Sequence, residues 1–239
     1  MSTTRKILNL KVELVRDLTH QVRELKLKCV EGTFAFRAGQ FVMLHVPQEG
    51  PKPALRAYSI ASAEQDSSGF TLLFKYVENG IASKFVWDLK GDETLQFTGP
   101  FGKVFFQEPP TDQAVFLNTG TGLSQHLSFI LSHHHKYPQL KWRLLFGVRN
   151  EQDIYYQDVL DQVKKEVPNF HYEYVLSRPS ETWLGKKGYV QNFISDFTPD
   201  TIPSTFYLCG NGAMIKDTKA ILAEKYSLDP KRIWAEAFD

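Results

Sequence analysis

The hydrophobic pattern changes character about midway along the chain. In the first half, short segments alternate apolar and polar residues, as half-buried strands do. Strands are predicted at residues 12–15, 22–30, 40–46, 55–60, 70–77 and 94–97, and one helix at about 82–89. Gly99-Pro100-Phe101-Gly102 predicts a tight turn after the last of these strands. Short strands separated by Gly and Pro favour an antiparallel barrel or sandwich.

A polar, Pro-containing stretch at residues 108–112 marks the change. Beyond it, strands predicted at 114–117, 142–146, 170–176, 206–209 and 233–235 alternate with helices at 123–132, 154–167, 189–194 and 213–225. This alternation predicts a parallel sheet covered by helices, with ligands at the carboxyl ends of its strands. We therefore predict an antiparallel β-barrel over residues 1–108 and a Rossmann-like α/β domain over 109–239.

Composition narrows the function. The 28 basic and 27 acidic residues nearly cancel, so no nucleic-acid partner is expected. No apolar run is long enough to span a membrane, and the start of the chain does not resemble a signal peptide, which favours the cytoplasm. Cys29 and Cys209 are too few to ligate an iron–sulfur cluster, which usually takes four thiolates. No metal site is expected either, because the adjacent side chains of His133–His135 point in different directions.

Two segments of the predicted barrel suit a nucleotide-like ligand. On a strand, Arg56 and Tyr58 share one face, so a guanidinium could bind a phosphate and an aromatic ring could stack on a flat heterocycle, with Ser59 beside it. In the second segment, Gly80 and the small residues after it open a helix whose free amides could hold a pyrophosphate. An ordinary barrel strand and a plain helix cap are the structural alternatives.

Three segments of the α/β half lie where a coenzyme would bind. Asn118 to Ser124, with glycines at 120 and 122, follows the first predicted strand and is a partial dinucleotide fingerprint. Cys209-Gly210-Asn211-Gly212 ends a later strand, and its cysteine is either a polarizable group beside the coenzyme or a core residue. Near the last residue, Glu236 and Phe238 could relay a proton and cover a ligand, or simply form an apolar strand.

In this order, the five segments 56–62, 78–85, 99–102, 118–124 and 208–214 resemble the ferredoxin–NADP reductase superfamily. The resemblance implies that Tyr58 stacks on the flavin, that Arg56 holds the pyrophosphate of FAD and that Ser59, Cys209 and Glu236 are catalytic. The FAD-binding residues that it implies are Arg56, Ala57, Tyr58, Ser59, Phe74, Lys75, Tyr76, Gly80, Ile81, Ala82, Ser83, Thr121 and Phe238. Those implied for NAD(P) are Gly120, Thr121, Gly122, Arg149, Ser177, Arg178, Cys209, Gly210 and Asn211.

The resemblance further implies a monomeric enzyme that moves a hydride from NAD(P)H to FAD and passes electrons to a separate acceptor. Ferredoxin or flavodoxin is the expected acceptor, and free flavin, a cytochrome or an oxygenase component are the alternatives. Ser177-Arg178 favours NADPH, because Arg suits the extra phosphate, whereas the Trp183–Val190 segment is similar to that of NADH-using members.

The chain departs from the family pattern at two positions. Gln125 stands where the family loop usually has Pro, and Asp239 extends one residue past the terminal aromatic. Gln125 favours an alternative in which the chain is a flavin-binding electron carrier or regulatory subunit with no NAD(P)H reaction of its own, but the Cys209-Gly210 segment and Phe238 argue against it. A flavin-free interaction module is a further alternative, and the Arg56–Ser59 segment argues against it.

Overall fold

The computed structural model describes residues 7–238. Its contacts divide the chain into two compact units. The first unit runs to Phe105 and includes Leu127–Ser132, and the second takes Phe106–His126 and the chain from His133 onward. Within the first unit, the Ser128 hydroxyl donates to the Ser62 carbonyl (2.8 Å) and Ser132 Oγ accepts from the Glu64 amide (3.0 Å).

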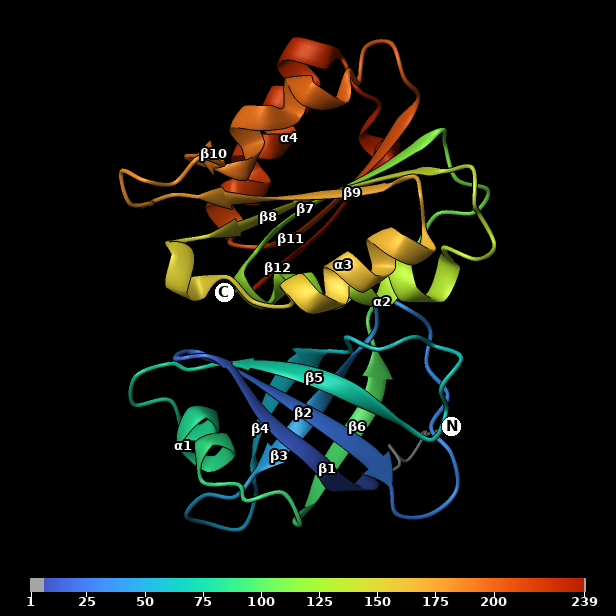
Figure 1. Cartoon of the computed structure of the whole chain (residues 1–239). Helices are drawn as coiled ribbons and strands as arrows, with labels where there is room; N and C mark the ends of the chain where they lie inside the picture. Colours follow the sequence, from blue (N-terminus) through green and yellow to red (C-terminus); the bar gives the residue numbers. More distant parts are fainter. Residues whose placement is uncertain (1–6, 239) are drawn as a thin grey trace. The chain divides into compact units, whose positions relative to one another are not determined.

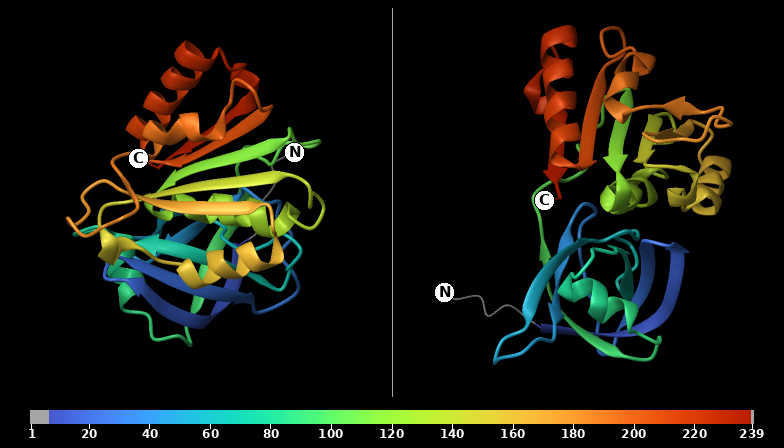
Figure 2. Two further views of the ribbon diagram at one scale, coloured as in Figure 1. Left: turned by 45° about the horizontal axis from the view of Figure 1, so that its top comes forward. Right: turned by 90° about the vertical axis from the view of Figure 1, so that its left-hand side faces the viewer.

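The first unit is an antiparallel barrel, as predicted (Figure 2). Its strands are β1 (Ile7–Thr19), β2 (Val22–Cys29), β3 (Phe41–Val46), β4 (Ala54–Ser59), β5 (Gly69–Lys75) and β6 (Thr94–Phe101), and its helix is α1 (Ile81–Trp87). The strand order is β4-β3-β6-β1-β2-β5. An antiparallel bridge between Ile60 and Leu72 then brings the two edge strands together and closes the barrel. Along β3, buried Val42, Leu44 and Val46 alternate with partly exposed residues, so one face of the strand forms the core.

The predicted turn at residues 99–102 was wrong. Gly99 to Phe101 continue β6, and Phe101 pairs with Phe41 of β3 across a register shift between Phe41 and Met43. A Cβ on Gly99 would lie 2.9 Å from Val42 Cγ1, so glycine lets the two strands approach closely here. The strand ends at Phe101 and is followed by Gly102, whose φ of +109° lies in a region that favours glycine.

The second unit is a parallel sheet flanked by helices, also as predicted. The strands are β7 (Gln113–Thr119), β8 (Lys141–Val148), β9 (Phe170–Leu176), β10 (Lys186–Lys187), β11 (Ser204–Gly210) and β12 (Ile233–Ala237). They lie in the order β10-β9-β8-β7-β11-β12. Strands β8 to β10 follow one another on one side of β7, and β11 and β12 lie on its other side, so the strand order reverses between β7 and β11. Such a switch point is where open α/β sheets bind ligands.

Helices cover both faces of this sheet (Figure 1). The α-helices are α2 (Leu123–His133), α3 (Gln157–Glu166) and α4 (Gly212–Tyr226), and the short 3-10 helices are η1 (Gly120–Gly122), η2 (Glu151–Asp153), η3 (Val190–Phe197) and η4 (Pro230–Arg232). Figure 1 shows α4 on one face and α2 with α3 on the other. No helix of the described chain has the length and apolar character needed to cross a membrane.

Two predicted helices differ from the observed ones. The helix expected from residue 154 begins at Gln157, because Tyr156 adopts a left-handed conformation (φ 60°) and buries its ring. The helix expected at residues 189–194 is the 3-10 helix η3. The two-residue strand β10 was not predicted, since a pair of lysines carries no strand pattern.

Candidate functional site

Strand β4 brings Arg56 and Tyr58 to the same face of the barrel sheet. They pair with Leu44 and Val42 of β3, two residues apart along the strand. The Tyr58 ring lies on Phe74 of β5, with ring centroids 4.2 Å apart, and burial raises the pKa of Tyr58 to about 12 although the Arg56 charge opposes the shift. The phenol therefore stays neutral, and its ring has a fixed support on one side.

The guanidinium of Arg56 is available to an anion. It is exposed and, among the described residues, its one hydrogen bond goes to the adjacent Leu55 carbonyl (2.9 Å). Ser59, next to Tyr58, is buried, and Ala57 is exposed on the opposite side of the strand from Tyr58. A guanidinium, a supported aromatic ring and a hydroxyl within four residues form a donor set that fits a phosphate joined to a flat ring system.

The three residues predicted on the neighbouring strand are not equivalent. Phe74 is 1 % exposed and belongs to the barrel core, so its side chain supports Tyr58 and is closed to solvent. Lys75 ends β5 and is exposed. Tyr76 follows it, also exposed, with its ring edge against Trp87 at 5.2 Å. A ligand would meet the side chains of Lys75 and Tyr76, but only the backbone of Phe74.

The second predicted segment opens α1, which packs against β3 and β5. The Gly80 amide donates to the Val77 carbonyl (2.9 Å), and Ser83 Oγ accepts from the Val77 amide (2.8 Å), so the turn before the helix is braced at both ends. A Cβ on Gly80 would lie only 3.0 Å from that carbonyl. The first helical bond runs from Lys84 N to Gly80 O, which leaves the amides of Ile81, Ala82 and Ser83 free of helical partners. This donor set also fits an anion.

In the α/β unit, glycines let two loops meet at the switch point. Gly122 packs against the Cys209 carbonyl so closely that an added Cβ would overlap it, and a Cβ on Gly210 would overlap Thr119. Thr119 Oγ1 accepts from the Asn211 amide (2.9 Å), which ties the loops together. Because β7 and β11 are neighbours, both predicted coenzyme segments lie at one edge of the sheet.

The loop after β7 has open space beside Gly120. An added Cβ there would meet nothing within 4 Å, although φ is +52°. The buried Tyr155 donates its hydroxyl to the Gly120 carbonyl (2.9 Å) and so holds the loop from below. Thr121, half-buried, follows in η1. The backbone here is partly exposed and is held in place by the Tyr155 hydrogen bond, so a pyrophosphate could approach it.

Arg149, Ser177 and Arg178 lie together at the ends of β8 and β9. The Arg178 amide donates to the Arg149 carbonyl (2.7 Å) and the Ser177 amide to the Val148 carbonyl (3.1 Å). Both guanidiniums are exposed, and the structure gives neither of them an ion pair within the described chain. Two cations at adjacent strand ends suit a phosphate group.

The predicted catalytic groups of this unit form a half-buried cluster at the end of β12. Cys209 of β11 is fully buried and pairs in register with Glu236 of β12. Burial and the nearby Glu236 charge raise the pKa of the Cys209 thiol, which therefore stays protonated. Burial also raises the pKa of Glu236, while a hydrogen bond from Gln125 opposes this shift.

Asn211 and Phe238 directly follow β11 and β12, the two strands that carry this cluster. The Asn211 side chain accepts from the amides of Ala213 and Met214 and caps α4, so its oxygen is already used by the helix. The Phe238 amide donates to the Gly210 carbonyl (2.9 Å), and its ring is partly exposed. Asp239, the second departure from the family pattern, lies outside the described residues.

Three contacts that build these sites were not predicted from the sequence, although Thr119 lies in the predicted 118–124 segment and Gln125 was noted as a departure from the family pattern. Tyr155 supports Gly120, Thr119 joins the two loops and Gln125 binds Glu236. The partners are 35, 92 and 111 residues apart, and no local pattern signals such contacts.

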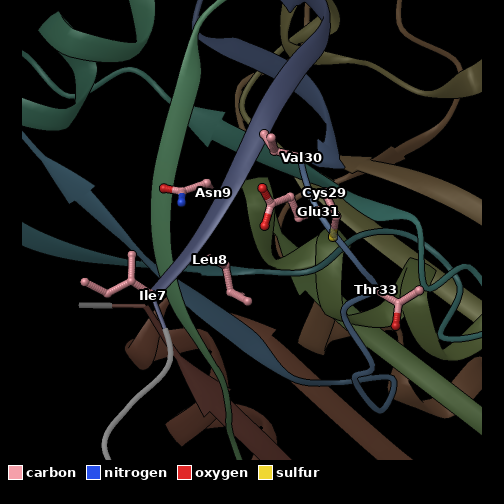
Figure 3. Close-up of a pocket in the computed structure, with 7 residues that line it drawn as sticks. All are labelled: Ile7, Leu8, Asn9, Cys29, Val30, Glu31 and Thr33. Atoms are coloured by element: carbon pink, nitrogen blue, oxygen red, sulfur yellow. The ribbon is translucent and has the colours of Figure 1, made fainter.

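A pocket of about 180 Å³ at the ends of β1 and β2 is lined by Glu31 and Thr33 among others, but by none of the predicted site residues (Figure 3).

The chain matches two family models in the order of its two units. An oxidoreductase FAD-binding domain covers residues 9–106, and an oxidoreductase NAD-binding domain covers residues 116–220. These matches place a flavin-binding function in the barrel and a nicotinamide-dinucleotide function in the α/β unit.

Individual relatives agree with these models. Ferredoxin–NADP reductase B of Sorangium cellulosum is 32% identical over 94% of this chain and 95% of its own length. Phenol hydroxylase P5 protein of Acinetobacter pittii is 28% identical over 88% of this chain, which spans 60% of that protein. The solved structure of the Amycolatopsis cytochrome P450 reductase GcoB superposes with a TM-score of 0.88 and 26% identity, over 98% of this chain and 71% of that one. The chain belongs to the ferredoxin–NADP reductase family and is an FAD-dependent NAD(P)H oxidoreductase.

Proposed function

We propose that this enzyme is a ferredoxin–NADP reductase that uses NADPH and exchanges electrons with a separate ferredoxin or flavodoxin. The observation that carries the proposal is the relationship to ferredoxin–NADP reductase B, which extends over 95% of that protein. The 239 residues hold two cysteines, too few for the four thiolates of an iron–sulfur cluster, so in this proposal the electrons leave the two units for an acceptor outside them. Neither cysteine forms a disulfide, which favours a reducing compartment such as the cytoplasm.

In this proposal the barrel holds FAD through side chains of β4 and β5 and through the backbone amides at the start of α1. Arg56 binds the pyrophosphate, Tyr58 stacks on the isoalloxazine ring and Ser59 hydrogen-bonds its polar edge. The amides of Ile81, Ala82 and Ser83 bind the second part of the pyrophosphate. Lys75 and Tyr76 flank the ring system. Bound FAD would supply the redox chemistry: its reduction by NAD(P)H takes up one proton with the hydride, and its reoxidation by an acceptor that takes electrons alone releases two protons.

The α/β unit orients the coenzyme mainly through its backbone. Gly120 and Thr121 approach the pyrophosphate of NAD(P)H, and the Gly210-Asn211 loop lies beside the nicotinamide half. Cys209 contributes a neutral, polarizable wall, since its buried thiol is protonated. Glu236 carries the proton that flavin reduction takes up, and Phe238 keeps the flavin-covering role that the family resemblance implies.

The coenzyme preference follows from Arg149 and Arg178. Their exposed guanidiniums at adjacent strand ends bind the additional phosphate of NADPH. We expect Arg178→Leu to raise the KM for NADPH about tenfold, since a hydrogen bond to a charged group contributes roughly 1.5 kcal/mol. The KM for NADH, measured on the same variant, is the internal control and should change little. An equal loss with both coenzymes would contradict this role of Arg178.

The test of the whole proposal is an anaerobic stopped-flow titration of the FAD-loaded protein with NADPH and with NADH. We expect the flavin absorbance to bleach faster with NADPH, and the reduced protein then to reduce ferredoxin or flavodoxin. A yellow protein that neither coenzyme bleaches would show that the chain is an electron carrier. A protein that does not retain FAD would refute the barrel assignment.

A second candidate acceptor is an oxygenase component. It is favoured by the similarity to phenol hydroxylase P5 protein and to the cytochrome P450 reductase GcoB. The same reduced protein, mixed with a cytochrome P450 in place of ferredoxin, distinguishes the two. Faster electron transfer to the P450 would assign the chain to an oxygenase system.

A further inference from the structure

Gln125 and Glu236 form a buried hydrogen bond between two elements of the α/β unit. Gln125 is the third residue of α2 and is 1 % exposed, and Glu236 lies in β12. The amide Nε2 of Gln125 donates to Glu236 Oε2 over 2.9 Å. Among the described residues, this amide is the one side chain that hydrogen-bonds the carboxylate. The residue that departs from the family pattern therefore contacts a predicted catalytic group directly.

The surroundings of Glu236 make this bond important. Its strand pairs with β11, so the Cys209 thiol is its register neighbour, and that thiol is fully buried and neutral. Half-buried surroundings disfavour a charged carboxylate and raise the pKa of Glu236, whereas the Gln125 amide favours the charged form. The balance between the two protonation states therefore depends on a single neutral donor.

The other ionisable groups nearby are poorly placed to take over this task. His126 follows Gln125 on α2, but burial lowers its pKa to about 3, so it carries no charge near neutral pH. Lys231 and Arg232 lie in η4, before the start of β12, and are exposed. Cys209 is kept protonated by burial and by Glu236 itself. Gln125 is thus the group that holds Glu236, and its hydrogen bond links the first turn of α2 to β12.

We propose that Gln125 is a positioning residue for Glu236, which fixes the orientation of the carboxyl group and stabilises its ionised form during proton transfer. This inference rests on the proposed role of Glu236 as the proton carrier. Reduction of the flavin by NAD(P)H takes up one proton in addition to the hydride. Glu236 passes that proton on and regains it from water, and the Gln125 amide stabilises the carboxylate between these two steps. A proline at position 125 would have no side-chain donor for this purpose.

The direct test is a titration of Glu236 in the FAD-loaded, oxidised protein by 13C NMR, with glutamate labelled at Cδ. The Glu236 signal is assigned by its loss in Glu236→Gln. Gln125→Met keeps the length of the side chain and removes the donor, and we expect the titration midpoint of Glu236 to move to higher pH. Gln162→Met is the matched control, because Gln162 donates to Glu166 (2.8 Å) on an exposed helix face. It should leave the Glu236 midpoint unchanged.

An unchanged or lowered midpoint in Gln125→Met would overturn the inference. If that variant does not fold, Gln125→Glu replaces it, because a second carboxyl at this position should raise the Glu236 midpoint by repulsion. An unchanged midpoint there would also overturn the inference.

A kinetic measurement separates the inference from the proposed function. The pH dependence of flavin reduction by NADPH should show a limb that is lost in Glu236→Gln and moves upward in Gln125→Met. A profile of Glu236→Gln identical to that of the wild type would refute the proton role of Glu236, and with it the proton-transfer step of the inference. Failure to reduce ferredoxin, with the limb still present, would instead refute only the proposed acceptor.

Discussion

The two units bury polar groups in different ways. In the barrel, buried charges are paired: Arg23 contacts Asp17 at 2.6 Å and Glu24 contacts Arg16 at 2.7 Å. Arg23 also donates to the carbonyls of Val86 and Trp87, so it fixes the end of α1 against β2. In the α/β unit, the groups buried near the strand ends are neutral, among them Asn118, Gln125 and His126.

This difference matches the way each unit is proposed to bind its ligand. The barrel adds a charged side chain to the amides at the start of α1: Arg56, proposed to meet a phosphate, is exposed and has no carboxylate partner in the described chain. The α/β unit presents backbone around Gly120 and Gly122 and supports it with neutral hydrogen bonds such as that of Tyr155. The hydrogen bond of Tyr155 thus braces the loop without adding a charge of its own.

The largest expected effect comes from breaking the backbone contact in the α/β unit. Gly122→Ala places a Cβ against the Cys209 carbonyl, so the loop after β7 must shift. Displacement of a binding loop by about an ångström costs roughly a hundredfold in rate. We expect that loss in stopped-flow reduction by NADPH, with the flavin spectrum unchanged. Gly32→Ala is the control: its Cβ meets open space away from the proposed sites, so only the left-handed φ of +68° is penalised, at about 1 kcal/mol. Equal losses in both variants would contradict the backbone model.

Removing a charge from the barrel should have the next largest effect. Arg56→Leu is expected to weaken FAD binding about thirtyfold, because a hydrogen bond to a charged group contributes roughly 2 kcal/mol. The measurement is FAD affinity from the quenching of flavin fluorescence. Arg37→Leu is the matched variant, since Arg37 is an exposed arginine of the same unit that stacks on Phe105 at 4.0 Å. Retained FAD affinity in Arg56→Leu, or an equal loss in Arg37→Leu, would remove Arg56 from the site.

The smallest expected effect concerns the neutral burial of His126. Its pKa is lowered to about 3 in the folded protein by burial, against about 6.5 in the unfolded chain. As pH falls below about 6.5, the unfolded chain binds the proton first, so stability should fall towards pH 3 by up to about 1.4 kcal/mol per pH unit.

Urea unfolding of the FAD-saturated protein at pH 6 and pH 4.5 measures this loss. His126→Gln should reduce the dependence on pH, whereas His171→Gln, which changes an exposed histidine of β9, should reduce it much less. The same dependence in the wild type and in His126→Gln would mean that His126 is not the titrating group.

The layout of both units could be predicted because it depends on local patterns. Alternation of apolar residues located β1 to β6, and the change of period after residue 108 indicated the parallel sheet. Errors occurred where tertiary contacts override local preference. Gly99 to Phe101 resemble a turn, yet pairing with β3 extends the strand through them. Tyr156 has a side chain that helices accept, but it adopts a left-handed backbone with its ring buried in the core.

The candidate site could be predicted only one segment at a time. Arg56 and Tyr58 were correctly placed on one face, because strand geometry alone dictates it. That Gly122 must be glycine could not be known, since the reason is the Cys209 carbonyl 87 positions later, at the end of a neighbouring strand. The bond between Gln125 and Glu236 was equally hidden: the sequence shows only that a proline is absent.

The crossing of the loops at Gly122 and Gly210 constrains how this enzyme could evolve. Each glycine is held by the backbone of the opposite loop, so a side chain at either position has no room unless both loops move together. Two simultaneous, compensating changes are rare in a mutational library. A selection for altered coenzyme use should therefore accumulate substitutions at exposed positions such as Arg149 and Arg178, and leave the two glycines untouched.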